Sequence, residues 1–344
     1  MSPLIWSLLI TSLATSTVIT LSSHHWLLAW LGLELNTLSI LPIIMKSQHP
    51  RATEATTKYF LIQAAAATMI LFAGTLNAWQ TGQWAMTTAS PTTTLLTTTA
   101  IMLKMGLTPV HMWYPQVLQG VTMHTALLIS TWQKLAPLAL LYMTNANMNQ
   151  HALLLLGLLS AAIGGWGGLN QTQTRMIMAF SSIAHMGWLM TALAMNQSLT
   201  TLTMLTYIIT TTAMFIPLAA ANTKTISDTG TTWTLSPTTM TATMFTLMSL
   251  GGLPPLTGFM PKWLILKELA TANLALLATL ILMSSLPSLF FYIRLAYLTM
   301  LTTPPTTTGT EHKWRFKPQP QTTAPLIMAA TLLLPLTTAL YNST

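Results

Sequence analysis

The segment GLTPVHMWYP, residues 106–115, is matched 146 positions later by GLPPLTGFMP, residues 252–261. The two segments share the glycine, the leucine and both prolines, and each has an aromatic residue at its eighth position. Each lies inside an apolar run, where a proline removes a backbone donor and interrupts a helix. The sequence therefore predicts two similar broken helices, one in each half of the chain.

The composition around these segments is that of a membrane protein. Charged residues make up 5% of the 344 residues and hydrophobic residues 52%, whereas a soluble domain has roughly 25% charged residues. At about 20 residues for each crossing plus short connections, the chain has room for roughly eleven transmembrane helices. We expect an all-α polytopic membrane protein that forms a single membrane domain over residues 1–344.

Eleven apolar runs can be placed between polar, proline or glycine residues. They lie near 3–21, 26–45, 55–78, 93–113, 123–145, 151–169, 175–195, 199–221, 237–271, 273–300 and 324–342. The fourth and ninth runs contain the two proline segments, so the repeat unit is five helices long. An odd number of crossings makes the second copy enter from the opposite face, as in ion and solute carriers. Two unrelated proline kinks in a helical bundle remain the alternative.

The predicted organisation follows from this repeat. We expect a first five-helix repeat over 3–145 and a second, inverted one over 151–300, with broken helices at the fourth and ninth positions. A loop over 301–322 and a C-terminal helix over 323–344 complete the chain.

Loop cations indicate the orientation. Alternating loops place only Lys267 on the side opposite the N-terminus. The N-terminal side receives Lys46, Arg51, Lys58, Arg175, Lys224, Lys313, Arg315 and Lys317. By the positive-inside rule the N-terminus faces the compartment of insertion, and eleven spans leave the C-terminus on the other side. The net charge of +8 is scattered without a basic face, so we expect no nucleic-acid partner.

Motifs that would hold a cofactor are missing from the sequence. The chain has no cysteine, which excludes thiolate metal sites and iron–sulfur ligation by this chain. No His/Met spacing repeats across the spans as copper or haem ligation would require. We therefore expect this chain to bind no metal and no redox cofactor, and any electron carrier to lie elsewhere.

Four ionisable residues fall well inside predicted spans: Glu34, Lys104, Lys134 and Lys262. Each costs at least about 2.5–3.5 kcal/mol at a bilayer centre, so none should face lipid. A carboxylate at Glu34 needs a cation, and Lys104, mid-span beside the first break, is the natural candidate. A buried lysine can release its proton whereas arginine stays protonated, so the three lysines form a candidate proton relay. Snorkelling and fixed ion pairs are the alternatives.

Two histidines could also take part in such a relay. His185 lies mid-span and can carry a proton between lysines near neutral pH, although a simple structural hydrogen bond is equally open. His111, beside the first break, is the weaker candidate of the two.

Five segments resemble one family of membrane proteins. They are WLGLELN at 30–36, HPRATEATTKYF at 49–60, the segment at 106–115, WQKLAP at 132–137 and GGLPP at 251–255. Together they resemble the chain 2 family of mitochondrial NADH-ubiquinone oxidoreductase, an antiporter-like membrane subunit of respiratory complex I. The resemblance extends over the whole chain.

This resemblance implies a function for the buried charges. It implies a non-redox subunit of an H⁺-translocating reductase that couples electron transfer from NADH to ubiquinone to proton pumping. Carried over residue by residue, the family's proton pathway falls on Glu34, Lys104, Lys134 and Lys262, and His185 matches a further position on it. The other function classes are a stand-alone cation/proton antiporter and a structural membrane subunit without a proton path.

The resemblance also implies surroundings for the chain. NADH, FMN, Fe–S clusters and ubiquinone would be held by the parent complex. The partners would be other complex I membrane subunits, accessory subunits and inner-membrane lipids such as cardiolipin. The chain would cross the mitochondrial inner membrane several times, with its N-terminus on the matrix side and its C-terminus on the intermembrane-space side.

Overall fold

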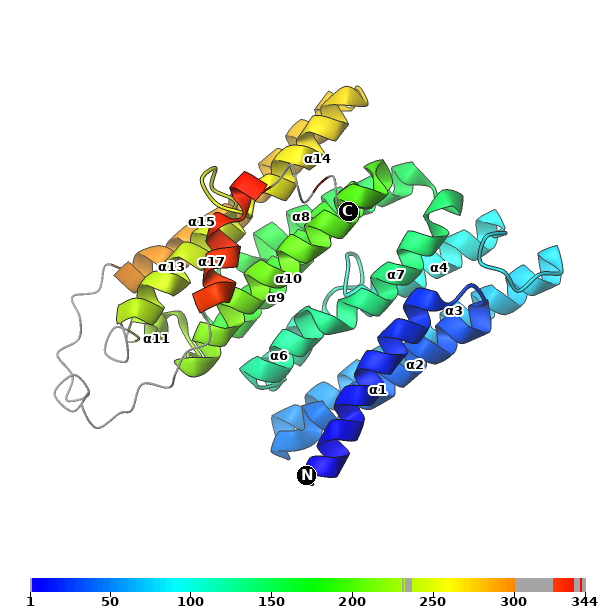
Figure 1. Cartoon of the computed structure of the whole chain (residues 1–344), viewed down its shortest axis with the longest axis horizontal. Coiled ribbons are helices and arrows are strands. Elements are labelled where there is room, and N and C mark those ends of the chain that lie inside the picture. Colours follow the sequence, from blue (N-terminus) through cyan, green and yellow to red (C-terminus); the bar gives the residue numbers. More distant parts are fainter. Residues whose placement is uncertain (1, 231, 233–236, 301–323, 337–340, 342–344) are drawn as a thin grey trace. The chain divides into compact units, whose positions relative to one another are not determined.

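The computed structural model describes residues 2–230, 232, 237–300, 324–336 and 341, and in this part the chain is helical (Figure 1). Extended pairing among the described residues is limited to two isolated bridges, His25 with Ala85 and Gln173 with Thr225. The chain divides into two compact units, residues 1–153 and 154–344. The predicted all-α membrane fold is confirmed, and the division into two five-helix repeats stays a prediction.

The first unit begins with three long helices. These are α1 (Pro3–Ser22), α2 (Trp26–Ile44) and α3 (Pro50–Thr81), with a 3-10 turn at Met45–Ser47. Helix α2 packs against both α1 and α3 (Figure 1). A Cβ added at Gly32 of α2 would lie 2.5 Å from the Thr20 Cγ2 of α1. The absence of a side chain at this position therefore lets α1 and α2 approach closely.

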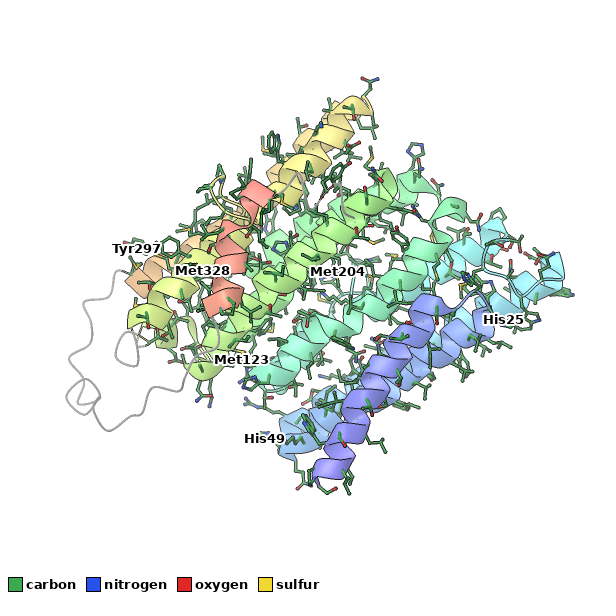
Figure 2. All side chains as sticks on the ribbon, viewed as in Figure 1. His25, His49, Met123, Met204, Tyr297 and Met328 are labelled. Atoms are coloured by element: carbon green, nitrogen blue, oxygen red, sulfur yellow. The ribbon has the colours of Figure 1, made fainter. Side chains whose placement is uncertain are left out.

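Histidines cap two of these helices. The His25 Nδ1 accepts the Leu27 backbone N–H at 3.2 Å at the start of α2. The His49 Nδ1 accepts the Arg51 N–H at 3.1 Å at the start of α3. Figure 2 shows these two caps at opposite ends of the first unit. They satisfy backbone donors that the first turn of each helix leaves free.

The rest of the first unit contains two interruptions. It comprises α4 (Pro91–Met105), α5 (Trp113–Gly120), α6 (Met123–Ser130), a 3-10 turn at Trp132–Lys134, α7 (Leu135–Thr144) and a 3-10 turn at Asn145–Asn147. The gap between α4 and α5 is the predicted first break. The turn between α6 and α7 was not predicted, because the sequence indicated one straight helix there. Pro137 explains it, since its ring lacks a donor and clashes with the Gln133 carbonyl in a regular helix.

The second unit repeats much of this order. Helix α8 (Gln150–Gly168) runs across the boundary between the units. It is followed by α9 (Thr174–Met195), α10 (Gln197–Ala220), α11 (Ile226–Gly230), α13 (Pro237–Gly251), α14 (Phe259–Thr271), α15 (Ala275–Met300), α17 (Ala324–Leu332) and a 3-10 turn at Leu334–Leu336. Helix α10 packs against α9 and α13, and α13 packs against α15. The gap between α13 and α14 is the predicted second break.

The two breaks begin with the same backbone turn, although the Thr108–Pro109 peptide of the first is cis and the matching Pro254–Pro255 peptide of the second is not. Gly106 and Gly252 both end a helix with a positive φ, +71° and +79°. The leucine after each glycine then donates its N–H to a methionine carbonyl five residues back, at 3.0 Å in the first break and 3.4 Å in the second. Helices α4 and α13 begin 146 residues apart, as do α5 and α14. The Gly-Leu pair thus forms the same turn twice. The inverted relation of the two repeats stays a prediction.

Eight helices in the described part are long and apolar enough to cross a membrane. They are Pro3–Ser22, Trp26–Ile44, Pro50–Thr81, Met123–Asn147, Gln150–Gly168, Thr174–Met195, Gln197–Ala220 and Ala275–Met300. The other three predicted spans are the two broken helices and the C-terminal run. The predicted loop at 301–322 and parts of the C-terminal helix lie outside the described residues, so the count of eleven stays a prediction.

Candidate functional site

Lys104 lies in the last turn of α4, two residues before Gly106. Its side chain is 6% exposed, and its Nζ is buried without a hydrogen-bond partner among the described residues. Gln63 of α3 donates to the Lys104 backbone carbonyl at 3.3 Å, which fixes the end of α4. Because an uncompensated buried ammonium costs several kcal/mol, the charge on this amine depends on what surrounds it.

Glu34, the expected partner of Lys104, is half-buried on α2. The Thr37 hydroxyl lies 3.1 Å from the Glu34 Oε2 and 2.8 Å from the Glu34 carbonyl oxygen, one turn earlier on the same helix. Glu34 lies near enough to Lys104 for its charge to matter electrostatically. No ion pair joins Glu34 to Lys104; the ion pair of Lys58 with Glu54 at 2.6 Å lies elsewhere on α3. The structure thus brings Glu34 within electrostatic reach of Lys104 but not into contact with it.

Lys134 closes the 3-10 turn between α6 and α7 and is 2% exposed. Its Nζ lies 4.9 Å from the centre of the Tyr114 ring, which belongs to α5 just after the first break. Tyr114 packs edge-on against Trp113 at 5.6 Å, and Trp113 packs the same way against Tyr59 at 5.9 Å. An aromatic face stabilises a cation without fixing it in an ion pair.

A buried amide network surrounds the same turn. The Gln133 Nε2 donates to the Asn36 Oδ1 at 3.2 Å, and the Tyr59 hydroxyl donates to the Gln133 Oε1 at 3.3 Å. These bonds tie the turn to α2 and α3. Sequence reasoning missed the network, although two signals were present: polar residues inside apolar runs, and Pro137 four residues after Gln133.

In the second unit, Lys262 lies in the first turn of α14 and folds back over the break. Its Nζ donates to the Gly251 carbonyl at 2.8 Å and lies 5.9 Å from the centre of the Trp188 ring. A Cβ on Gly252 would lie 2.8 Å from the same Nζ. A cation at the carbonyl end of α13 is favoured by the helix dipole, so this amine is anchored by the break itself.

His185 lies on α9 and shares a cavity with Lys262. The cavity encloses about 390 Å³ of empty space, part of it open, and Trp188, Tyr207 and threonines of α10 also line it. The His185 Nε2 is 3.3 Å from the Tyr292 hydroxyl, and its ring centre is 5.8 Å from that of Tyr207. The structure therefore brings His185 and Lys262 to one cavity within the second unit.

His111 lies inside the first break. Its ring is buried, and its Nδ1 is 3.2 Å from the Pro109 carbonyl, two residues earlier. This short-range bond gives the ring a structural role in the break. Within the described residues, no group of three or more His, Cys, Asp or Glu side chains is arranged to hold a metal ion.

Comparison with known proteins gives the family. The model of the NADH:quinone oxidoreductase/Mrp antiporter transmembrane family matches residues 23–288, and that of the NADH dehydrogenase subunit 2 C-terminus matches residues 289–341. NADH-ubiquinone oxidoreductase chain 2 of Carassius auratus is 51% identical over 348 residues and is covered fully, as is this chain. The chain belongs to the NADH-ubiquinone oxidoreductase chain 2 family. The chain 2 protein of Struthio camelus is 50% identical over 327 residues, 94% of each chain.

Solved structures agree with this chain 2 assignment. A chain of respiratory complex I from Thermus thermophilus superposes with a TM-score of 0.83 at 27% identity, over 97% of this chain and 78% of that one. The Mrp complex from Dietzia contains a chain with a TM-score of 0.82 at 17% identity, over 97% and 76%, which shows a shared fold. The resemblance expected from the sequence is confirmed, as is the antiporter-like membrane fold.

Proposed function

We propose that this chain moves protons through a relay of Glu34, Lys104, Lys134 and Lys262 during electron transfer from NADH to ubiquinone. As a chain 2 protein it is a membrane subunit of NADH-ubiquinone oxidoreductase, the proton-translocating respiratory complex I. The NADH, FMN and Fe–S cofactors of that complex lie in its other subunits. One observation carries the proposed relay: the Lys104 amine is buried at a helix break, has no hydrogen bond to the part of the chain that the structure describes, and lies within electrostatic reach of Glu34.

The geometry supports a switch at Lys104. The Glu34 carboxylate accepts the Thr37 hydroxyl of its own helix and makes no ion pair with Lys104. A small approach of this carboxylate favours the protonated amine, and its withdrawal favours release of the proton. In the first unit we assign Lys134 as the acceptor of the released proton. The Tyr114 ring lies beside its amine.

The second unit has its own proton-handling centre. Lys262 and His185 line one cavity, and Tyr292 and Tyr207 contact the imidazole there. An imidazole exchanges protons near neutral pH and a lysine amine can do so when buried. We assign His185 the role of a bridging carrier beside Lys262.

The family and the loop charges support a location, an orientation and a set of partners for the chain. The chain is a multi-pass protein of the mitochondrial inner membrane. We place its N-terminus on the matrix side and its C-terminus on the intermembrane-space side, because cations concentrate in the loops of the N-terminal side. Other complex I subunits are its partners, and we expect inner-membrane lipids such as cardiolipin and no nucleic acid beside them. We expect no cofactor on this chain.

A stand-alone antiporter is the less favoured function. The Mrp structure shares the fold alone, whereas residues 289–341 match a family model specific to NADH dehydrogenase subunit 2. The two functions separate experimentally, because a stand-alone antiporter would work without the redox subunits.

The test uses the intact complex in sealed vesicles, with Lys104→Met in this chain or at the matching position of a tractable homologue. We expect normal assembly, with ubiquinone-linked NADH oxidation and proton pumping falling together by about tenfold or more. Lys58→Met is the matched control, because Lys58 is a half-buried lysine of the same unit that lies outside the proposed relay. Normal turnover and pumping in Lys104→Met would show that the buried lysine is structural.

A further inference from the structure

We propose that Gln133 is a positioning residue that couples the helix of Glu34 to Lys134 through its hydrogen bonds to Asn36 and Tyr59. This inference rests on the proposed function and adds to it a residue that carries no proton. Gln133 directly precedes Lys134 in the 3-10 turn, and its side chain is 8% exposed.

The amide of Gln133 is fixed at both ends. Its nitrogen donates to the Asn36 Oδ1 at 3.2 Å, and its oxygen accepts the Tyr59 hydroxyl at 3.3 Å. Asn36 and Tyr59 are themselves buried, on α2 and α3. A buried amide with partners on both its donor and its acceptor side has one preferred orientation, because turning it over would put like groups together.

The backbone of the 3-10 turn around Gln133 depends on these side-chain hydrogen bonds. Pro137 prevents a regular helix through Gln133, and the chain passes through a 3-10 turn in which the Lys134 N–H donates to the Thr131 carbonyl at 3.3 Å. Successive side chains of a 3-10 turn point about 120° apart, since it has three residues for each turn. Gln133 therefore reaches α2 and α3 while Lys134 reaches the Tyr114 ring of α5.

The network connects the helix that carries Glu34 to the turn that carries Lys134. Asn36 is two residues after Glu34 on α2, and Thr37 contacts the Glu34 carboxylate. A movement of α2 that accompanies a change of charge at Glu34 also moves Asn36. The Asn36–Gln133 bond passes this movement to the turn that holds Lys134. Because neither amide titrates, the bond transmits position and leaves proton transfer to the lysines.

The test compares variants of the intact complex in sealed vesicles. Gln133→Met keeps the size of the side chain and removes both hydrogen bonds. We expect about fivefold lower ubiquinone-linked turnover for each assembled complex, with the KM for ubiquinone unchanged. Tyr59→Phe removes one of the two bonds and should have a smaller effect. The paired exchange Asn36→Gln with Gln133→Asn keeps one long and one short amide, and should recover activity that each single exchange loses.

Three results would overturn the inference. One is wild-type turnover for each assembled complex in Gln133→Met. Another is a loss of total activity that matches a loss of assembled complex, which would assign Gln133 to packing. The third is the absence of recovery in the paired exchange. If Gln133→Met does not assemble, Tyr59→Phe and the paired exchange decide the question by the same measurements.

Lys134→Met separates this inference from the proposed function. If Lys134→Met pumps normally, the proposed relay is wrong, and Gln133 then has no proton-carrying residue to position. If Lys134→Met is defective while Gln133→Met is normal, the relay stands and only the role of Gln133 is wrong.

Discussion

The breaks α4–α5 and α13–α14 begin with the same glycine turn but hold their lysines differently. Lys104 precedes its glycine by two residues and is buried without a hydrogen bond among the described residues. Lys262 follows its glycine by ten residues and donates to the Gly251 carbonyl at 2.8 Å. The positions that match Lys104 and Lys262 in the other break are Leu250 and Gln116. The repeated glycine turn is therefore a common scaffold on which each unit places its own cation.

For the proposed relay, this difference predicts two kinds of proton site. An amine without a hydrogen bond responds strongly to a nearby carboxylate, because little else stabilises its charge. An amine bonded to a helix-terminal carbonyl keeps a local partner whatever the charge around it. We therefore assign switching to the first unit and a more constant site to the second.

The largest expected effect tests the switch directly through a double-mutant cycle. Glu34→Gln and Lys104→Met should each lower pumping by about tenfold or more, and the double variant should be no worse than Lys104→Met alone. The reason is that Glu34 acts through the charge of Lys104. Proton uptake of sealed vesicles for each NADH oxidised is the measurement. Losses that multiply in the double variant would show that the two residues act independently.

The glycines of the breaks allow a sharper comparison. Alanine at either position adopts a left-handed conformation that costs roughly 1–2 kcal/mol. At Gly106 the new Cβ would also lie 3.0 Å from the Tyr114 Cβ, near the backbone, whereas at Gly252 it would meet the flexible end of Lys262. We expect Gly106→Ala to lower the thermal stability of the complex more, and Gly252→Ala to lower turnover for each assembled complex more. Equal changes in both measurements would contradict the difference between the two breaks.

Replacing Trp188, the aromatic neighbour of Lys262, is expected to have the smallest effect on turnover. Trp188→Leu removes the ring 5.9 Å from the Lys262 amine, and Trp188→Phe keeps a ring as the matched control. A cation–π contact of about 0.5–1 kcal/mol corresponds to roughly two- to fivefold lower turnover in Trp188→Leu. The steady-state rate of each assembled complex measures this. An equal loss in Trp188→Phe would show that packing, and not the ring face, is what matters.

The sequence predicted the breaks and the buried charges because both depend on local rules. Glycine and proline inside an apolar run indicate an interrupted helix, and the depth of a charge within such a run can be counted. The family resemblance was predictable for the same reason, since short motifs carried it. These features needed no knowledge of which helices pack together.

The remaining features depend on packing between distant segments. Gln133 bonds Asn36 across 97 residues, so no local pattern could reveal that pair. Glu34 and Lys104, expected as partners, form no ion pair, and the carboxylate accepts a hydroxyl from Thr37 on its own helix. This detail depends on how α2 and α4 pack. The anchoring of Lys262 by the Gly251 carbonyl likewise follows from how α14 folds back over its break.

The most direct measurement replaces Lys104 by arginine in the intact complex and counts protons pumped for each NADH oxidised in sealed vesicles. Arginine keeps the positive charge but does not release its proton. If Lys104 carries protons under the control of Glu34, Lys104→Arg should assemble and be as defective in pumping as Lys104→Met. Wild-type pumping in Lys104→Arg would show that the site needs only a fixed cation, and would contradict the relay.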